Sequence, residues 1–323
     1  MENKYSRKYL IETGIGLQDV DNLKNSAYFL SESERYIKGE ISLDELEEIV
    51  SSYYKNKPNE EERTKEADTI AQRIAKILSD DFFSFTVGQL VSIHKQLFDG
   101  IFSHAGKLRT YNFYKKEWVL DGASVTYGDY RDLEAVLEFD LSLEKRFRYI
   151  GLSKEEVVEH LAIFISNLWQ IHAFEEGNTR TTAVFIIKYL RSLGFDVTND
   201  SFSENAWYFR NSLVRANYND LSKGIEEDRS FLIKFLNNLL FNEHNVLSNK
   251  ELHVKPRKEP ETSKKDSRII HLIENNPYIT SEELSKELGV SIRTVKSLIA
   301  SLKEKGIIER VGGKNHGHWE VKK

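Results

Sequence analysis

Apolar residues return every three or four positions along much of the chain, the spacing that places them on one face of a helix. This pattern predicts amphipathic helices from residue 64 onward and over 86–98, 133–143, 155–170, 204–216 and 228–240. Between 182 and 192 nearly every residue is apolar, which is typical of a helix at the buried centre of a bundle. Gly194 follows as a predicted helix stop.

One segment, residues 106–129, departs from the helical pattern. It contains two short apolar runs, 118–120 and 125–127, separated by Asp121-Gly122. An Asp-Gly pair between such runs is a strong signal for a tight hairpin turn. The sequence therefore predicts a β-hairpin inside an otherwise helical protein.

Charge and proline content divide the chain into four parts. Residues 1–60 are predicted to form short helices, one of which starts with a capping box made by Ser42 and Glu45. Residues 61–247 form the helical core. Residues 248–266 hold two prolines among dense charges and are predicted to be a linker, so that 267–323 make up a separate domain.

Composition narrows the class of protein. Of the 323 residues, 40% are hydrophobic and 11% aromatic, enough for a large core. The absence of cysteine excludes a disulfide framework, a thiolate zinc site and a cysteine nucleophile. The first residues carry no apolar signal segment, and no apolar run approaches the ~18 residues of a membrane span, so we expect a cytoplasmic protein without membrane contact.

The end of the chain differs in charge from the rest. From Lys264 onward, twelve Lys and Arg stand against eight Asp and Glu, a balance of +4. Because the whole chain has a net charge of −5, the remainder carries −9. A basic domain beside an acidic body is compatible with a nucleic-acid partner, although an ordinary solvated surface gives the same sign.

Residues 267–323 have the pattern of three helices and a hairpin, at 267–274, 280–289 and 291–306 and then 307–321. This arrangement resembles a winged helix-turn-helix domain, in which the third helix enters the DNA major groove and the wing contacts the backbone. The residues that would then face DNA are Arg293, Thr294, Lys296, Ser297 and, on the wing, Lys314. Docking of a protein partner is the alternative use of such a domain.

The segment between the two strongest helices, residues 171–182, carries the chemistry. It is a loop that ends on a helix N-terminus, where free N–H groups and the helix dipole favour an anion. Gly177 allows a ligand to approach the backbone, and Arg180 in the first turn calls for an anionic partner. Glu176 beside an anion makes sense if a divalent cation bridges the two, and His172 at the loop entrance suits a general base. A nucleoside triphosphate with Mg²⁺ fits this set.

The same string resembles the signature of the Fic family, H-x-F-x-[D/E]-G-N-G-R-x-x-R. The matching positions are His172, Phe174, Glu176, Gly177, Asn178 and Arg180. The resemblance implies a mainly α fold, a Fic-type helical bundle with a small β-hairpin flap, here joined to a small α+β winged-helix domain. Residues 1–60 would correspond to antitoxin-like helices.

The resemblance also implies a role for each motif residue. His172 is the base that activates a protein hydroxyl, and Glu176 holds Mg²⁺ on the phosphates. Gly177 and Asn178 cradle the phosphates, and Arg180 binds the β-phosphate. Phe174 anchors the loop in the core.

Two positions depart from the signature. Thr179 replaces a glycine, so the backbone there is expected to be ordinary, and its hydroxyl could cap the helix. Ala183 replaces the final arginine, which should weaken the grip on ATP. Many relatives pair that arginine with an inhibitory glutamate in an S/T-x-x-x-E-[G/N] helix, and no such string precedes the core here.

The function predicted from these residues is a protein adenylyltransferase that moves AMP from ATP to a Ser, Thr or Tyr hydroxyl of a protein, which could be the chain itself. The alternatives are a nucleotide-sensing transcriptional regulator with a degenerate core, and a Fic enzyme that transfers another phosphate-containing group. Besides ATP, the protein target and DNA, a second copy of the chain is a candidate partner.

Overall fold

The computed structural model describes residues 4–56, 62–254, 264–312 and 317–322. The chain forms two compact units, Met1–Val254 and Lys255–Lys323. Residues 255–263 of the predicted linker lie outside the described residues. In the described ranges, no helix is both long and apolar enough to cross a bilayer.

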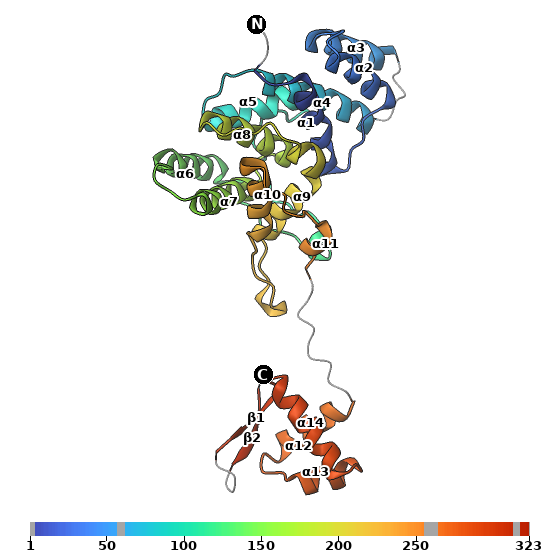
Figure 1. Cartoon of the computed structure of the whole chain (residues 1–323), viewed down its shortest axis with the longest axis vertical. Coiled ribbons are helices and arrows are strands. Elements are labelled where there is room, and N and C mark those ends of the chain that lie inside the picture. The colour runs from blue at the N-terminus through green and yellow to red at the C-terminus, as the bar shows by residue number, and fades with distance from the viewer. Residues whose placement is uncertain (1–3, 57–61, 255–263, 313–316, 323) are drawn as a thin grey trace. The chain divides into compact units, whose positions relative to one another are not determined.

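In the first unit the described helices are joined by loops, the longest of which includes residues 106–129 (Figure 1). Its α-helices are α1 (Arg7–Gly16), α2 (Ala27–Ile37), α3 (Leu43–Asn56), α4 (Glu62–Ser79), α5 (Val87–Phe98), α6 (Leu133–Arg146), α7 (Lys154–Ile171), α8 (Asn178–Ser192), α9 (Ser201–Ala216), α10 (Ser230–Phe241) and α11 (Asn249–Leu252). Three short 3-10 helices, η1 (Leu17–Asp21), η2 (Trp118–Leu120) and η3 (Leu221–Lys223), lie in the connections. The predicted helices of the core are confirmed, and Gly194 takes a left-handed φ of 92° just after α8.

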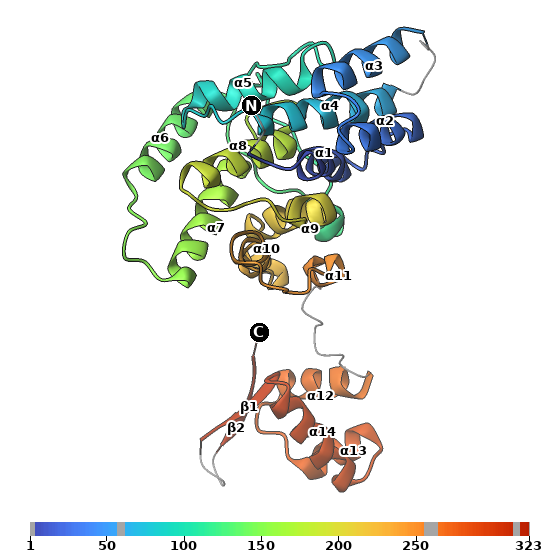
Figure 2. The ribbon, with the colours of Figure 1, turned by 45° about the horizontal axis from the view of Figure 1, so that its top comes forward.

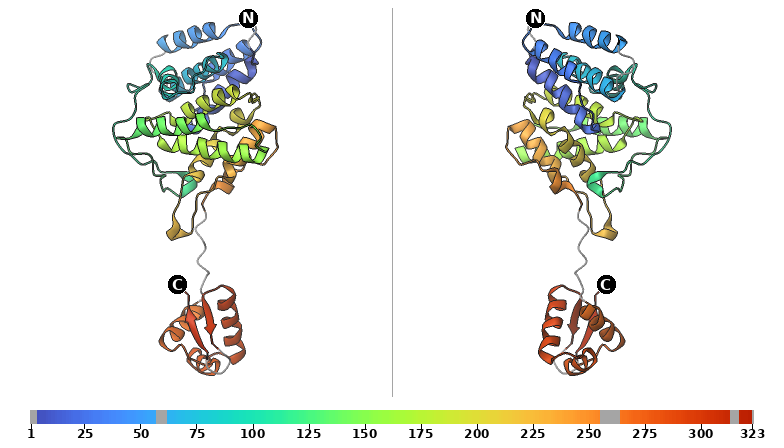
Figure 3. Two further views of the ribbon diagram at one scale, coloured as in Figure 1. Left: turned by 90° about the vertical axis from the view of Figure 1, so that its left-hand side faces the viewer. Right: turned by 90° about the vertical axis from the view of Figure 1, so that its right-hand side faces the viewer.

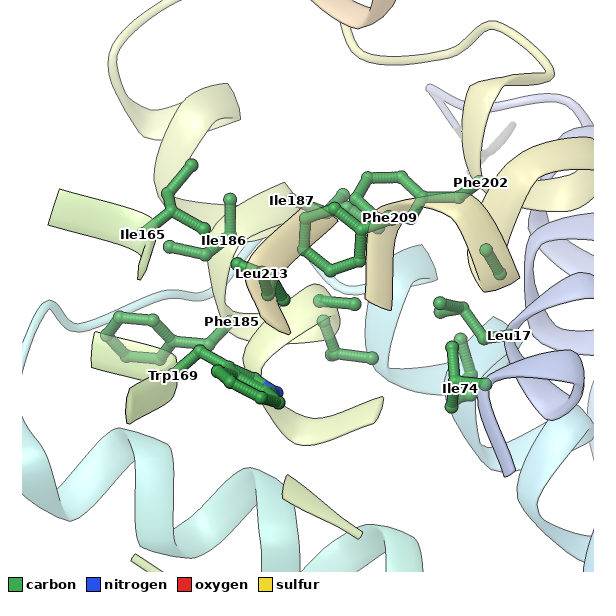
Figure 4. Packing of buried hydrophobic residues seen from close by; sticks show 14 of the residues in the cluster. Leu17, Ile74, Ile165, Trp169, Phe185, Ile186, Ile187, Phe202, Phe209 and Leu213 are labelled. Atoms are coloured by element: carbon green, nitrogen blue, oxygen red, sulfur yellow. The ribbon is translucent and has the colours of Figure 1, made fainter. Parts of the chain in front are cut away.

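Helix α8 is the centre of this unit, as its apolar sequence predicted. It contacts α5, α4 and α7, and every residue from Asn178 to Leu190 is buried (Figure 2). Around it the aromatic and branched side chains of neighbouring helices interlock, including Trp169 on α7 and Phe209 on α9 (Figure 4). A helix that is buried on all sides positions its own N-terminus rigidly, which matters for the loop that precedes it.

The first helices pack closely on this core. Helix α1 lies against α4 and α9, and Gly14 and Gly16 permit the contact. A Cβ atom would lie 2.2 Å from the Ala71 backbone oxygen at Gly14 and 2.3 Å from the Ser203 backbone oxygen at Gly16.

The capping box predicted at Ser42 and Glu45 is confirmed. Glu45 N–H donates to Ser42 Oγ (3.2 Å), and Ser42 N–H donates to the Glu45 carboxylate (2.7 Å).

The predicted hairpin at 106–129 is wrong. No residue of this fully described segment, called the flap below, is in a strand. Residues 118–120 form η2 instead, and Asp121 and Gly122 follow in the left-handed region with φ of 55° and 84°. Apolar runs of three residues were too short to distinguish a strand from a 3-10 turn, and here Val119 and Leu120 are buried in the core.

The second unit has the predicted winged-helix elements: α12 (Lys264–Asn275), α13 (Ser281–Leu288), α14 (Ile292–Glu304) and the antiparallel strands β1 (Ile308–Val311) and β2 (His318–Val321) (Figure 3). Thr280 and Glu283 form a capping box on α13, and Ser291 caps α14. A small core of its own, with Ile269, Leu302 and Trp319, holds the unit together.

Candidate active site

His172 lies where α7 ends. It takes the left-handed conformation (φ 51°, ψ 57°), and its backbone N–H donates to the Trp169 oxygen at 3.1 Å. The imidazole is 3% exposed, stacks on Tyr127 with ring centroids 4.0 Å apart, and meets the edges of Trp169 and Phe113. Within the described part of the chain, neither ring nitrogen has a hydrogen-bond partner. Buried polar groups are normally hydrogen-bonded, so the two free ring nitrogens retain the capacity to bond a ligand.

Burial and charge keep this imidazole neutral. Burial lowers the pKa of His172 well below its usual value, and the nearby cations Lys115, Arg210 and Arg109 lower it further. A neutral imidazole at neutral pH has a free lone pair, which is the form that a general base requires.

Arg109 holds the backbone around His172 in place. Burial lowers the pKa of the Arg109 guanidinium, which is 2% exposed. Its side chain donates mainly to backbone oxygens. At the C-terminal end of α7 these are the oxygens of Ile171 (3.3 Å) and His172 (2.7 Å), and in the flap they are those of Tyr111 (2.7 Å) and Gly128. Carbonyls at a helix C-terminus have no partner within the helix, so a buried arginine that satisfies them holds the turn in place. No sequence signal pointed to this role, because most of the partners are backbone atoms.

The motif loop, residues 172–177, is braced by two further side chains. Asn178 accepts from Phe174 N–H (2.9 Å) and donates to the Phe174 oxygen (2.7 Å). His94 stacks on Phe174 with ring centroids 3.8 Å apart, and its Nε2 lies 3.1 Å from the Glu176 oxygen. Because Gly106 N–H donates to His94 Nδ1 at 2.8 Å, the proton of the neutral ring is on Nε2. The Phe174 side chain, 2% exposed, lies in the core as expected.

Gly177 is the N-cap of α8, and both its conformation and its surroundings require glycine. Its φ is 76°, and a Cβ atom would lie 2.3 Å from the ring of Phe98. The prediction that Thr179 could cap the helix is wrong, because Thr179 lies inside α8. Its backbone is ordinary, as expected, and its hydroxyl accepts from the Trp169 indole N–H at 2.9 Å.

Glu176 extends from the loop to the flap. Lys115 Nζ lies 3.1 Å from its Oε1 and 3.3 Å from its Oε2, and the carboxylate is 40% exposed. In the described ranges, no three His, Asp or Glu side chains gather as ligands for a metal. A cation at Glu176 would therefore take one carboxylate from the protein and the rest of its ligands from water or substrate, the manner in which Mg²⁺ binds at phosphate sites.

Arg180 is part of a buried ion-pair cluster. Its side chain is 1% exposed, with Nε 2.9 Å from Asp21 Oδ2 and Nη2 2.8 Å from Glu66 Oε1. Nη1 donates to Gln18 Oε1 at 3.3 Å, and the guanidinium lies over the Phe98 ring at 4.9 Å. The anionic partner that the sequence demanded for this arginine is thus supplied by η1 and α4. Contact of Arg180 with a phosphate stays a prediction.

The structure brings the predicted residues together on one loop and helix start, and the Ala183 side chain is fully buried in α8. The sequence analysis did not identify Asp21 and Glu66 as partners of Arg180, Lys115 as the partner of Glu176, or Arg109 as the partner of the His172 carbonyl. Each of these residues lies far along the chain from its partner. A cavity of about 750 Å³ along α3, α4 and α5 is lined by none of the motif residues. Its buried lysine, Lys188, donates to backbone oxygens of Ile77 (2.9 Å) and Asp80 (2.5 Å).

On the second unit, the residues predicted to face DNA lie on the surface of α14. Arg293, Thr294, Lys296 and Ser297 are all exposed, while Val295 between them is buried. Lys314 lies outside the described residues. The exposed stripe is the arrangement that a recognition helix needs.

The comparisons with known proteins agree with this division. Residues 84–190 match the model of the Fic/DOC family, and residues 262–309 match the model described as winged helix-turn-helix DNA-binding. The chain thus carries a Fic/DOC-family domain followed by a winged helix-turn-helix domain.

Two curated proteins are similar to separate parts of the chain. The protein adenylyltransferase VbhT of Bartonella schoenbuchensis is 26% identical over 166 residues, which cover 44% of this chain and 33% of that protein. The HTH-type transcriptional regulator GolR of Listeria innocua is 43% identical over 49 residues, covering 15% of this chain and 19% of that protein. The chain thus matches about a third and a fifth of these relatives' lengths.

Solved structures that are similar to this chain include two from different bacteria. The N-terminal Fic domain of a Bep effector protein from Bartonella sp. AR 15-3 gives a TM-score of 0.41 at 19% identity, covering 61% of this chain and 85% of that one. A Fic family protein from Desulfovibrio desulfuricans gives 0.44 at 13% identity, covering 98% and 87%.

Proposed function

We propose that the chain is an adenylyltransferase that transfers AMP from ATP to a Ser, Thr or Tyr hydroxyl of a protein. The observation that carries the proposal is the His172 imidazole. It is buried and held neutral, neither nitrogen has a hydrogen-bond partner among the described residues, and it lies one short loop before the N-terminus of α8. The match of residues 84–190 to the Fic/DOC family model and the similarity to VbhT support the same reaction.

In this reaction His172 takes the proton of the target hydroxyl. The hydroxyl oxygen forms a bond to the α-phosphorus of ATP, and the bond from that phosphorus to the pyrophosphate oxygen breaks. Arg109 holds the backbone carbonyl of His172 and so keeps the imidazole in one orientation. Tyr127 stacks on the ring and Trp169 packs against it edge-on, so both reduce the contact of the ring with water.

The phosphates are proposed to lie at the start of α8. Gly177 leaves the first N–H groups of the helix without a capping side chain, and the helix dipole is positive there. For Arg180 to bind the β-phosphate, its guanidinium would have to leave Asp21 and Glu66.

Glu176 is the residue that would hold Mg²⁺. Its carboxylate is partly exposed and already binds a cation, the Lys115 ammonium, through both oxygens, so it fits a metal that keeps most of its ligands as water and phosphate oxygens. When bound, Mg²⁺ neutralises phosphate charge and thereby favours attack at phosphorus.

The source of the label decides between the candidate reactions. Wild-type protein is incubated with a cell lysate and Mg²⁺, and either α-³²P-ATP or γ-³²P-ATP. Label on protein from the α-phosphate alone supports AMP transfer, and label from the γ-phosphate alone shows a kinase. Glu176→Gln should lose the labelling, whereas the neighbouring Glu175→Gln should keep it. ATP binding without any labelling would favour the nucleotide-sensing regulator, and labelling only from another nucleotide would favour transfer of a different group.

A second function, DNA binding, is proposed for the second unit. The exposed Arg293 and Lys296 on α14 support it, as does the match to a winged helix-turn-helix model. The full chain is mixed with a random-sequence duplex library at low salt, and bound DNA is measured. Retention of duplex that weakens with salt supports the proposal, and no retention leaves protein docking as the role of this unit.

A further inference from the structure

Three cations surround His172, and only one of them can reach a ligand. Arg109 uses its guanidinium on backbone carbonyls at the end of α7. Arg210 on α9 lies 2.7 Å from Glu117, whose side chain is 1% exposed, so its charge is needed to balance a buried carboxylate. Lys115, on the flap, is the remaining cation.

The side chains in the first two turns of α8 offer the phosphates little positive charge. At the two positions where the Fic signature has arginines, this chain has Arg180, which is enclosed by Asp21 and Glu66, and Ala183, which is fully buried and apolar. A triphosphate bound at the start of α8 therefore needs a cation from another part of the fold.

Lys115 is placed to supply it. In the described part of the chain, Glu176 is the only side chain that pairs with its ammonium, and the Lys115 side chain is 26% exposed. The flap backbone is fixed at this point, because Lys115 N–H donates to Ser124 Oγ at 3.2 Å. A partly exposed ion pair of this kind is weak, about 1 kcal/mol or less, and exchanges readily.

We propose that Lys115 is an exchangeable cation of the active site, an inference that rests on the proposed function. In the empty site its ammonium neutralises Glu176. When a divalent cation takes the Glu176 carboxylate, the ammonium turns to the phosphate chain of the nucleotide and supplies the charge that Arg180 and Ala183 do not. Lys115 thus both competes with the metal and binds the nucleotide.

The competition is measured with Mn²⁺ alone, by electron paramagnetic resonance on the full chain without nucleotide. Lys115→Met removes the competing ammonium and should tighten Mn²⁺ binding about two- to fivefold. Glu176→Gln should abolish binding at this site. Lys116→Met, a substitution of the exposed neighbouring lysine, is the matched control and should leave Mn²⁺ affinity unchanged.

The contact with phosphate is measured with α,β-methylene-ATP, which is not cleaved at the α-phosphorus, in saturating Mn²⁺ by calorimetry. Lys115→Met should weaken binding about tenfold, because an ammonium–phosphate hydrogen bond is lost. Lys115→Arg should restore most of the affinity, and Lys116→Met should have no effect.

The two arms together test the inference. Tighter Mn²⁺ binding with weaker nucleotide binding in Lys115→Met supports it. Unchanged nucleotide affinity, weaker Mn²⁺ binding, or equal effects in Lys116→Met would overturn it. Both readouts are binding, so they stay informative if wild-type protein transfers no AMP, a result that would reject the proposed reaction and leave the role of Lys115 standing.

Discussion

The Arg180 cluster provides a quantitative test of the structure. In Arg180→Met the side chain keeps its apolar stem but loses the charge that Asp21 and Glu66 share. Removing one partner of a buried ion pair costs about 3–5 kcal/mol, because the remaining charge is left unpaired. The carboxylates are 23% and 15% exposed, so water compensates in part, and we expect the lower end of that range.

About 3 kcal/mol corresponds to a fall in melting temperature of roughly 6–12 °C for a unit of this size. Unfolding is followed by tryptophan fluorescence, which reports mainly on the first unit because Trp118, Trp169 and Trp207 belong to it. Arg35→Met is the matched control: its partner Glu32 lies 2.6 Å away, but Arg35 is 45% exposed, so loss of this solvent-screened pair should leave the melting temperature nearly unchanged. Equal melting temperatures for the two variants would refute the buried cluster.

Three further predictions concern the loop and the second unit. Gly177→Ala forces a Cβ onto the Phe98 ring, so it should lower the free energy of unfolding in urea by about 1–3 kcal/mol and abolish AMP transfer. The control is Gly194→Ala, a position with left-handed φ but open space around it, which should keep AMP transfer. Burial lowers the pKa of His94 to about 4, so as the pH falls His94 is protonated in the unfolded chain before it is protonated in the folded one. The free energy of unfolding should therefore fall by about 3 kcal/mol between about pH 6.5 and pH 4, and His94→Asn should remove this part of the pH dependence. Arg293→Ala should weaken duplex binding by ~1–3 kcal/mol in a fluorescence-anisotropy titration and relax sequence preference; unchanged binding would exclude a base contact.

The helices of both units could be predicted because their signals are local. Spacing identified the amphipathic helices of the core. In the second unit, the predicted helix starts at 280 and 291 coincide with the N-cap residues Thr280 and Ser291. The prediction of a hairpin in the flap failed because its signals are not local. Its conformation depends on tertiary contacts, such as the Glu117–Arg210 ion pair and the Lys115–Glu176 pair, which no local pattern encodes.

In the candidate site, only the residues that are continuous in the sequence could be predicted. The loop from His172 to Arg180 is one continuous string, so the residue types and their order were visible in the sequence. The partners of Arg180 were not, since Glu66 and Gln18 are 114 and 162 residues away. The role of Arg109 could not be predicted either, because its side chain bonds mainly backbone carbonyls, which every residue has.

The central claim is that the neutral His172 imidazole is the base for AMP transfer. The direct measurement is kcat/KM for transfer of the α-phosphate label, for wild type and His172→Ala, between pH 5 and 9. We predict a loss of at least ~10²-fold in the variant, and a wild-type rate that stays level below pH 6.5 because the pKa of the free enzyme's His172 is lowered by burial. A variant that retains the wild-type rate, or a wild-type rate that falls with a midpoint near 6.5, would contradict the account.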